Sequence, residues 1–365
     1  MIDNHFIKHI KIENFRCFEN LKIEGLNRVN LLGGDNSVGK SAFLEILEIA
    51  AKTDNSWSLI LAIKDIINRR QRSDAYYNSQ PNEFDIITYG NDSVSVIANN
   101  ISINLVIKHT GQLAFFGSIS GDQSISELQG NYIDENLFVE LTINNNTEKI
   151  PYNKFSDILS NKRETSFTLR NIQMKLIENI EFIPSTRLDE RKLSTLYGTI
   201  VDMGMMRDID AFLTTFDVRI EALIIRPTER YSVFKLKLRD KNEPVLLSSM
   251  GGGLNRYLAI VCAIWKSKNG QLFIDEVENG IHYTKYSKLW EIIFKTSKEA
   301  NCQIFAATHS KECIEAFSRV AEEYDNENIK YINFSRDADN AGRIIATVLD
   351  SIGIENNFQL GFDVR

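Results

Sequence analysis

The chain has 365 residues, of which 43% are hydrophobic and 25% are charged, and its formal net charge is −7. This length suits two ordinary domains or one large domain with insertions, and the composition is that of a folded globular protein. A disordered chain, a collagen and a histone-like basic protein are therefore excluded. The net negative charge disfavours nucleic-acid binding over the whole surface, but it is compatible with a local basic patch.

The cysteines and the apolar runs argue against two further classes of protein. The four cysteines are scattered and form no Cys-x-x-Cys pair, so a zinc site is not expected. The longest apolar run, Leu258 to Trp265, is much shorter than the roughly 18 residues that a membrane span needs. The first residues lack the basic and apolar segments of a signal peptide, so we expect a cytoplasmic protein with no membrane contact.

The amino-terminal part of the chain predicts strands followed by helices. Short alternating runs and the apolar segment 29–32 indicate three strands, and apolar residues recur at helical spacing from Ser41 to Lys52. A second amphipathic helix is predicted from Trp57 to Arg72. Its basic end, with Arg69, Arg70 and Arg72, is interpreted as a solvated helix terminus, and a DNA contact is the alternative.

The rest of the chain predicts hairpins and then a parallel sheet. Alternating runs between 83 and 152 are separated by Asn, Gly and Asp, which is typical of antiparallel hairpins. A short strand is expected at 180–183 and a helix at 208–223. From Leu246 onward, predicted helices alternate with apolar strands at 272–274 and 303–306, which indicates a parallel sheet covered by helices.

A phosphate-binding pattern, G-x-x-x-x-G-K-S, follows the third predicted strand and opens a predicted helix. Its residues are Gly34, Asp35, Asn36, Ser37, Val38, Gly39, Lys40 and Ser41. The glycines allow backbone amides to face a phosphate, and the helix adds its positive amino-terminal end. Lys40 is expected to neutralise the β and γ phosphates of ATP, and Ser41 to ligate Mg²⁺.

Two acidic residues end the apolar strand predicted at 272–274. Asp275 is placed to hold the Mg²⁺ shell, and Glu276 is placed to orient and deprotonate a water that attacks the γ-phosphate. Such a pair is common by itself. Together with the pattern at 34–41, it predicts ATP hydrolysis rather than ATP binding alone.

A serine and glycine run at 247–253, here called the signature loop, precedes a predicted helix and offers a second anion site. A flexible glycine loop is the alternative reading. The arrangement resembles the signature motif of ABC-type ATPases of the SMC, RecF and OLD-like class. In that family, the signature of one subunit closes over the nucleotide held by another. The resemblance therefore implies that Ser249 and Gly251 contact the γ-phosphate of a second copy.

Other segments carry the same resemblance. The strand that ends at His309 matches the place of the family's switch histidine, which implies a hydrogen bond from His309 to the γ-phosphate or to the attacking water. The segment 278–282 resembles the region where subunits meet. In all, residues 5–55 and 245–315 resemble the family. No Q-loop glutamine stands out among the candidates, which are Gln112, Gln123, Gln129 and Gln173.

The expected fold is α/β, a P-loop NTPase of the ABC-ATPase head type, with a mixed β-sheet flanked by helices. Residues 1–60 and 240–365 are expected to form the ATPase core in two lobes. Residues 61–239 are expected to be an inserted region of β-hairpins and helices. The resemblance implies an ATP-hydrolysing head that dimerises head to tail, or forms a higher oligomer, around ATP.

The resemblance also implies a partner. Stand-alone heads of this size resemble the ATPase component of PARIS-like antiphage defence systems, in which a separate Toprim-type nuclease is the effector and DNA or a phage product is the trigger. Asp337 and Asp339 are interpreted as a hairpin tip rather than a nuclease metal site. The alternatives are a transporter subunit, a scaffold that does not hydrolyse ATP, and a RecF-like DNA-repair clamp. The clamp would add a second basic cluster to the one at 69–72, formed by Arg226, Arg230, Lys235, Lys237 and Arg239. The period-two pattern from Lys235 to Arg239 is interpreted as the solvated face of a half-buried strand, and a DNA contact is the alternative.

Overall fold

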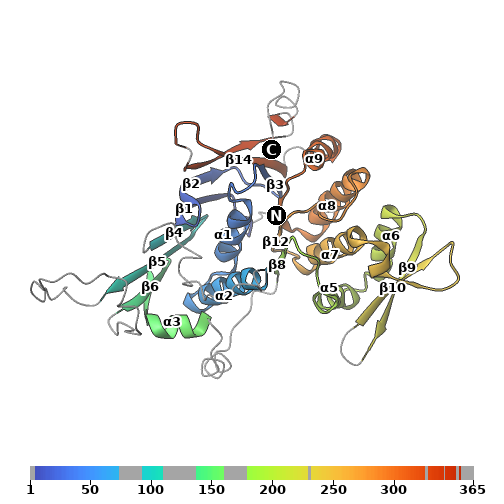
Figure 1. The fold of residues 1–365 in the computed structure, drawn as a ribbon, viewed down its shortest axis with the longest axis horizontal. Coiled ribbons are helices and arrows are strands. Elements are labelled where there is room, and N and C mark those ends of the chain that lie inside the picture. The colour runs from blue at the N-terminus through green and yellow to red at the C-terminus, as the bar shows by residue number, and fades with distance from the viewer. Residues whose placement is uncertain are drawn as a thin grey trace, which may run out of the picture.

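The structure is a computed structural model. It describes residues 5–73, 93–109, 137–159, 179–228, 232–324, 328–340, 342–350 and 353–354. Within these ranges, two six-stranded sheets and one three-stranded sheet are packed with helices (Figure 1). This mixture of sheets and flanking helices confirms the predicted α/β class.

The central sheet contains the strands that precede the predicted site residues. Its strand order is β15 (Ile344–Leu349), β14 (Ile329–Arg336), β3 (Val29–Gly34), β13 (Gln303–Ala307), β12 (Gln271–Ile274) and β8 (Ile180–Ile183). The strands from β14 to β8 are parallel, which confirms the predicted parallel sheet, and β15 is antiparallel to β14. Every residue of β3, β12 and β13 is buried, as expected for parallel strands covered on both faces. The carboxyl ends of these three strands lie at one edge of the sheet.

Helices cover both faces of the central sheet (Figure 1). They are α1 (Lys40–Lys52) and α2 (Ser56–Ser73) on one face, and α7 (Gly252–Lys266), α8 (Tyr286–Ala300) and α9 (Lys311–Tyr324) on the other. Successive strand residues point to opposite faces. Leu272 and Ile274 therefore join the core cluster of α7 to α9, whereas Phe273 joins the cluster of α1 and α2.

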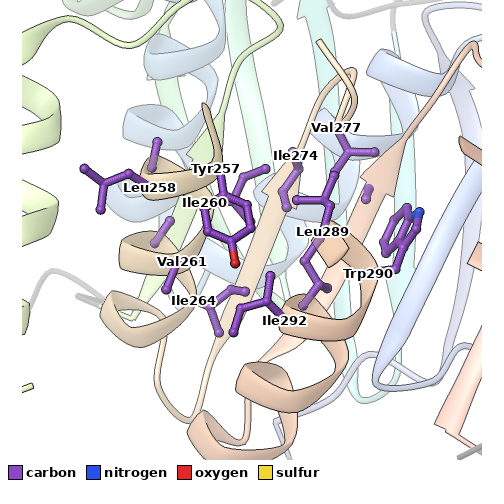
Figure 2. Packing of buried hydrophobic residues seen from close by; sticks show 14 of the residues in the cluster. Tyr257, Leu258, Ile260, Val261, Ile264, Ile274, Val277, Leu289, Trp290 and Ile292 are labelled. Carbon is purple, nitrogen blue, oxygen red and sulfur yellow. The ribbon is translucent and has the colours of Figure 1, made fainter. Parts of the chain in front are cut away.

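Figure 2 shows the buried layer formed by α7, β12 and α8. Ile260, Ile274 and Leu289 come from these three elements, and each is 0% exposed. Trp290 is also fully buried, and its indole N–H donates to the Cys313 carbonyl at 3.1 Å, so its one polar group is satisfied. This packing holds α7, which follows the signature loop, against the strand that leads to Asp275.

The second six-stranded sheet is antiparallel throughout, which confirms the predicted hairpins. Its order is β2 (Phe18–Glu24), β1 (His9–Phe15), β4 (Ser93–Ala98), β5 (Ile101–His109), β6 (Leu137–Ile143) and β7 (Asn146–Pro151). The pairing of β1 with β4 places Ile12 opposite Val96. A helix, α3 (Tyr152–Leu159), follows β7 and buries Phe155, Ile158 and Leu159.

The third sheet corrects one prediction. The helix predicted at 208–223 ends at Phe216 as α6 (Met206–Phe216), and Ile220–Pro227 is strand β9. Strand β9 pairs with β10 (Ser232–Leu238), which pairs with β11 (Val245–Leu246). The predicted helix was too long at its carboxyl end. The β-branched residues of β9 pair along a strand there, and such residues favour a sheet over a helix. Another helix, α5 (Glu190–Asp202), precedes α6.

The segment 61–239 contributes strands to all three sheets. Strand β8 pairs with β12 in the central sheet. Strands β4 to β7 extend the second six-stranded sheet, here called the amino-terminal sheet, and β9 and β10 lie in the third sheet. The division into a core of 1–60 and 240–365 with an insertion between them stays a prediction. The backbone pairing nevertheless joins that insertion to the core at β8 and β4.

Candidate functional site

The loop at 34–41 connects the carboxyl end of β3 to the first turn of α1, as predicted. Gly34 and Gly39 have φ angles of 125° and 90°, which are rarely adopted by residues with a side chain. A Cβ on Gly34 would lie 2.1 Å from the Phe334 carbonyl oxygen, and one on Gly39 would lie 2.5 Å from Cys17 Sγ. The two glycines are therefore required both by their backbone angles and by close packing.

Lys40 is the basic residue of this loop, and its side chain folds back over it. The ammonium Nζ donates to the carbonyl oxygens of Gly34 at 2.6 Å and Asp35 at 2.7 Å. Burial lowers the pKa of Lys40 to about 8, while nearby carboxylates, led by Asp35 and Asp275, act in the opposite direction. The positive charge of Lys40 is thus held at the loop and close to the acidic end of β12.

Ser41 and Asp275, the two residues predicted to hold Mg²⁺, lie in contact. Ser41 Oγ is 3.0 Å from each carboxylate oxygen of Asp275. Burial raises the pKa of Asp275, and the hydrogen bond from Ser41 together with the charge of Arg256 counteracts this shift. The contact forms because β3 and β12 are parallel strands of one sheet that end at the same edge.

Glu276 begins the turn after β12 and is half-buried. Its φ angle is 51°, in the left-handed region that residues with side chains rarely occupy. The side-chain amide of Asn279 donates to Glu276 Oε2 at 3.4 Å and to the Ser185 carbonyl at 2.8 Å. Glu276, the predicted base, is therefore held by its backbone conformation and by one contact with the Asn279 amide.

His309 lies at the carboxyl end of β13, at the same sheet edge, and its side chain is exposed. Its backbone N–H donates to Glu278 Oε1 at 2.9 Å. His309 also lies close enough to Asp275 to lower the pKa of that carboxyl. The turns that follow β12 and β13 are thereby connected. His282 is exposed and bonds Thr284, so its predicted role at an interface stays a prediction.

Ser249 and Gly251 belong to the signature loop, directly before α7. Ser249 is exposed in a short 3₁₀ turn, Leu247–Met250, and its hydroxyl donates to the Leu246 carbonyl at 2.7 Å. Gly251 has φ 91° and immediately precedes α7. Among the residues that the structure describes, neither makes a hydrogen bond with the loop at 34–41. The structure therefore groups Lys40, Ser41, Asp275, Glu276 and His309, and it leaves the two signature-loop residues facing solvent.

Arg256 is a site residue that no sequence pattern indicated. Arg256 is 5% exposed, and its guanidinium Nη2 donates to the carbonyl oxygens of Asp275 at 2.5 Å and Glu276 at 2.9 Å. Burial lowers its pKa to about 10, and the charges of Asp275, Glu278 and Glu276 counteract that shift. The available signal was an arginine inside a mostly apolar helix, which requires buried acceptors.

The donor set suits ATP with Mg²⁺. A hydroxyl and a carboxylate oxygen are hard ligands, and Mg²⁺ in phosphate sites usually takes one or two protein ligands together with phosphate oxygens and water. No group of three or more His, Cys, Asp or Glu side chains able to hold a metal occurs in the described part of the chain. The loop, which Gly34 and Gly39 allow to turn sharply through their positive φ angles and which has Lys40 beside it, fits a phosphate group.

Some residues that the sequence singled out lie elsewhere in the fold. Arg69 pairs with buried Glu48 and Arg70 bonds buried Glu45, so the interpretation of this basic end as a solvated terminus was wrong for both residues. The two arginines join α2 to α1. The side chain of Arg72, residue Arg230 and the four candidate Q-loop glutamines lie outside the described residues.

The second basic cluster lies on β10 and next to it. Phe234, Leu236 and Leu238 are buried, while Lys237 is exposed and bonds Glu221 at 2.9 Å. This alternation is that of a half-buried strand with a solvated face.

Asp337 and Asp339 lie in the turn between β14 and β15, which confirms the predicted hairpin tip. In the described ranges, every helix is too short or too polar to cross a membrane.

The chain is 27% identical over 349 residues to an ATP/GTP phosphatase of Helicobacter pylori, covering 87% of this chain and 89% of that protein. It is 30% identical over 115 residues to Structural maintenance of chromosomes protein 6 of Saccharomyces cerevisiae, covering 30% of this chain and 10% of that protein.

Two solved structures are also similar. The SMC head domain from Thermotoga maritima is 15% identical with a TM-score of 0.46, covering 94% of this chain and 98% of that one. The Smc head domain with an extended coiled coil bound to the C-terminal domain of ScpA, from Pyrococcus furiosus, is 13% identical with a TM-score of 0.48, covering 97% and 98%.

The strand, glycine loop and helix over 29–52, with the acidic end of β12 beside them, form a P-loop NTPase fold. A family model described as "AAA domain, putative AbiEii toxin, Type IV TA system" matches residues 29–315, which is most of the chain and includes every predicted site residue. The chain therefore belongs to this family of P-loop AAA-domain proteins.

Proposed function

We propose that the chain is a Mg²⁺-dependent ATPase. The observation that carries this proposal is the contact between Ser41 Oγ and the Asp275 carboxylate at 3.0 Å, directly beside the loop that ends in Lys40. A phosphate cradle and a pair of hard oxygen ligands in contact are what a nucleoside triphosphate with Mg²⁺ requires. The similarity to a protein named as an ATP/GTP phosphatase supports the same activity.

Each of the site residues has its own role in the proposed hydrolysis. Ser41 and Asp275 hold the metal ion, which supplies charge neutralisation at the phosphates when bound. Lys40 neutralises the β and γ phosphates. Glu276, which follows Asp275 at the strand end, accepts a proton from the attacking water. His309, at the end of the neighbouring strand, hydrogen-bonds the γ-phosphate or that water.

We further propose that two copies close around ATP, with Ser249 and Gly251 of one copy facing the nucleotide held by the other. Two features support this arrangement. Both residues are exposed, and Gly251 directly precedes α7, a 15-residue helix whose amino-terminal end favours anions. Within the described residues they do not bond their own phosphate loop, so a second copy is the partner that would use them.

The proposed work of this ATPase is control of a partner protein, a separate Toprim-type nuclease in antiphage defence with DNA or a phage product as the trigger. The family description names a putative toxin of a toxin–antitoxin system, which supports a role with a second component. The neighbouring gene provides the first test. A gene for a Toprim-type nuclease supports this role, whereas replication genes would favour a DNA-repair clamp.

The experiment for the ATPase proposal compares phosphate release by the wild type, Glu276→Gln and Lys40→Ala. Lys40→Ala should lose ATP binding because the triphosphate loses its charge partner. Glu276→Gln should still bind ATP but turn over about 100-fold or more slowly. Glu19→Gln removes an exposed carboxylate on β2 and is the matched control. Equal rates for wild type and Glu276→Gln would reject the assignment.

A further inference from the structure

Arg256 joins α7 to the ends of two strands of the central sheet. Its Nη1 donates to the Pro184 carbonyl, directly after β8, and its Nη2 donates to the carbonyls of Asp275 and Glu276, directly after β12. Three acceptors at fixed positions suit the planar fork of a guanidinium, whereas a lysine ammonium on a flexible stem does not match them. The side chain is 5% exposed, so these bonds are largely shielded from bulk water.

The two bonds from Nη2 bracket the Cα atom of Glu276. The Asp275 carbonyl belongs to the peptide group before this Cα, and the Glu276 carbonyl belongs to the peptide group after it. Holding both peptide groups restricts the φ and ψ angles of Glu276. Its φ of 51° is one that a glutamate adopts only when its surroundings impose it. Arg256 is therefore placed to impose the backbone conformation that aims the Glu276 carboxylate.

The same arginine lies one turn along α7 from the signature loop. The first turn of α7 packs tightly on the turn after Glu276, because a Cβ on Gly253 would lie 2.4 Å from the Gly280 carbonyl oxygen. A movement at the amino-terminal end of α7 would thus be transmitted to the Arg256 guanidinium and through it to the peptide groups around Glu276.

We propose that Arg256 is a positioning residue for Glu276 and that it couples the signature loop to the same chain's hydrolysis site. When Ser249 and Gly251 engage the nucleotide of a second copy, α7 shifts and Arg256 brings Glu276 into its working position. Each copy then hydrolyses its own ATP in response to its contact with the other. This coupling rests on the proposed ATPase function and on the two-copy arrangement.

The test measures kcat and KM for ATP in Arg256→Lys, with Arg191→Lys, an exposed arginine on α5, as the matched control. We expect kcat of Arg256→Lys to fall about tenfold or more while KM stays within about twofold, because ATP binding uses the loop at 34–41. Thermal unfolding of each variant reports whether the fold is retained. A wild-type kcat in Arg256→Lys would overturn the proposal.

A second measurement separates positioning from a general structural role. Arg256→Lys is combined with Glu276→Gln, and we expect no further loss of kcat beyond that of Glu276→Gln alone, because Arg256 acts through Glu276. A further loss equal to that seen in the wild-type background would overturn the positioning role, whether or not the variant is less stable. If wild type and Glu276→Gln had equal kcat, the proposed function would fall as well. If they differed while Arg256→Lys matched wild type, only this inference would fall.

A third measurement tests the coupling. We expect the wild-type rate per molecule to rise with protein concentration as copies associate on ATP. Light scattering should show that Arg256→Lys still associates with ATP, while its rate per molecule stays flat. A rise equal to that of the wild type would overturn the coupling, and so would loss of association in this variant.

Discussion

Ser41 and Asp275 are 234 positions apart in the sequence, yet the Ser41 hydroxyl lies 3.0 Å from both carboxylate oxygens of Asp275. Ser41 begins α1 after β3, and Asp275 follows β12. Strand β13 lies between these two strands and is parallel to both, so the carboxyl ends of β3 and β12 lie at one edge of the sheet.

Removal of either oxygen ligand should weaken Mg²⁺ binding at the site. For Ser41→Ala and for Asp275→Asn, we expect the Mg²⁺ concentration at half-maximal phosphate release to rise about tenfold or more, because the metal loses a hard ligand. Mg²⁺ titrations of the ATPase rate measure this shift. Ser232→Ala, on β10, is the control. An unchanged titration for both site variants would show that these residues do not hold the metal.

Gly39→Ala should disrupt the phosphate loop. The φ of 90° and the 2.5 Å approach to Cys17 Sγ leave no room for a methyl group, so we expect a loss of stability of about 1–3 kcal/mol together with loss of ATP binding. Calorimetry with ATP and thermal unfolding check both effects. Gly198→Ala is the control, because a Cβ there meets nothing within 4 Å. Full ATP binding by Gly39→Ala would contradict the prediction.

Ser249→Arg should separate association from nucleotide binding. A large cation at the exposed signature loop obstructs a second copy, whereas the Lys40 ammonium is held by the Gly34 and Asp35 carbonyls and not by Ser249. We expect monomeric ATP binding to persist while ATP-dependent association is lost in size-exclusion chromatography with light scattering. Thr195→Arg, exposed on α5, should associate normally. If Ser249→Arg associates as well, the two-copy arrangement is wrong.

Glu48 should contribute to the pH dependence of stability. It is 0% exposed; burial raises its pKa, but Arg69 and Lys52 outweigh this effect, so that the pKa lies below the usual 4.5. Because the folded pKa is lower than the unfolded one, the stabilisation is present above about pH 4.5 and is lost as the pH falls through the folded pKa. The unfolding free energy of the wild type should therefore decrease more steeply below that pH than that of Glu48→Gln.

At pH 7, Glu48→Gln should be less stable than the wild type by about 3 kcal/mol, because Arg69 and Lys52 lose their buried partner. Urea unfolding at a series of pH values measures both quantities. Glu19→Gln, which removes an exposed carboxylate, should behave as the wild type does. Parallel stability profiles for wild type and Glu48→Gln would rule out this contribution.

Local patterns predicted most of the elements that form the site. The strand, loop and helix around Lys40 follow from glycine spacing and from helical periodicity, which involve residues close together in the chain. The alternation of helices and apolar strands after Leu246 predicted the parallel sheet for the same reason. The hairpins of the amino-terminal sheet followed from period-two alternation and turn residues.

Predictions failed where distant partners controlled the outcome. The helix expected to reach Leu223 stops at Phe216 because the following residues pair with β10. Arg69 and Arg70 looked like a solvated helix end, but both are bound by glutamates of α1, a helix that the sequence pattern did not show to be adjacent. Periodicity describes which face of an element is apolar, but not which element that face meets.

By itself, the amino-acid sequence determined the phosphate loop, the order of strands and helices around it, and the candidate residues Asp275 and Glu276. Only the tertiary structure decided that Asp275 touches Ser41 and that Arg256 bonds the carbonyls on both sides of the Glu276 Cα. The physical reason is that every residue carries the same backbone carbonyl. Which carbonyl a buried guanidinium reaches depends on how a helix packs on a sheet, and no local sequence pattern records that packing.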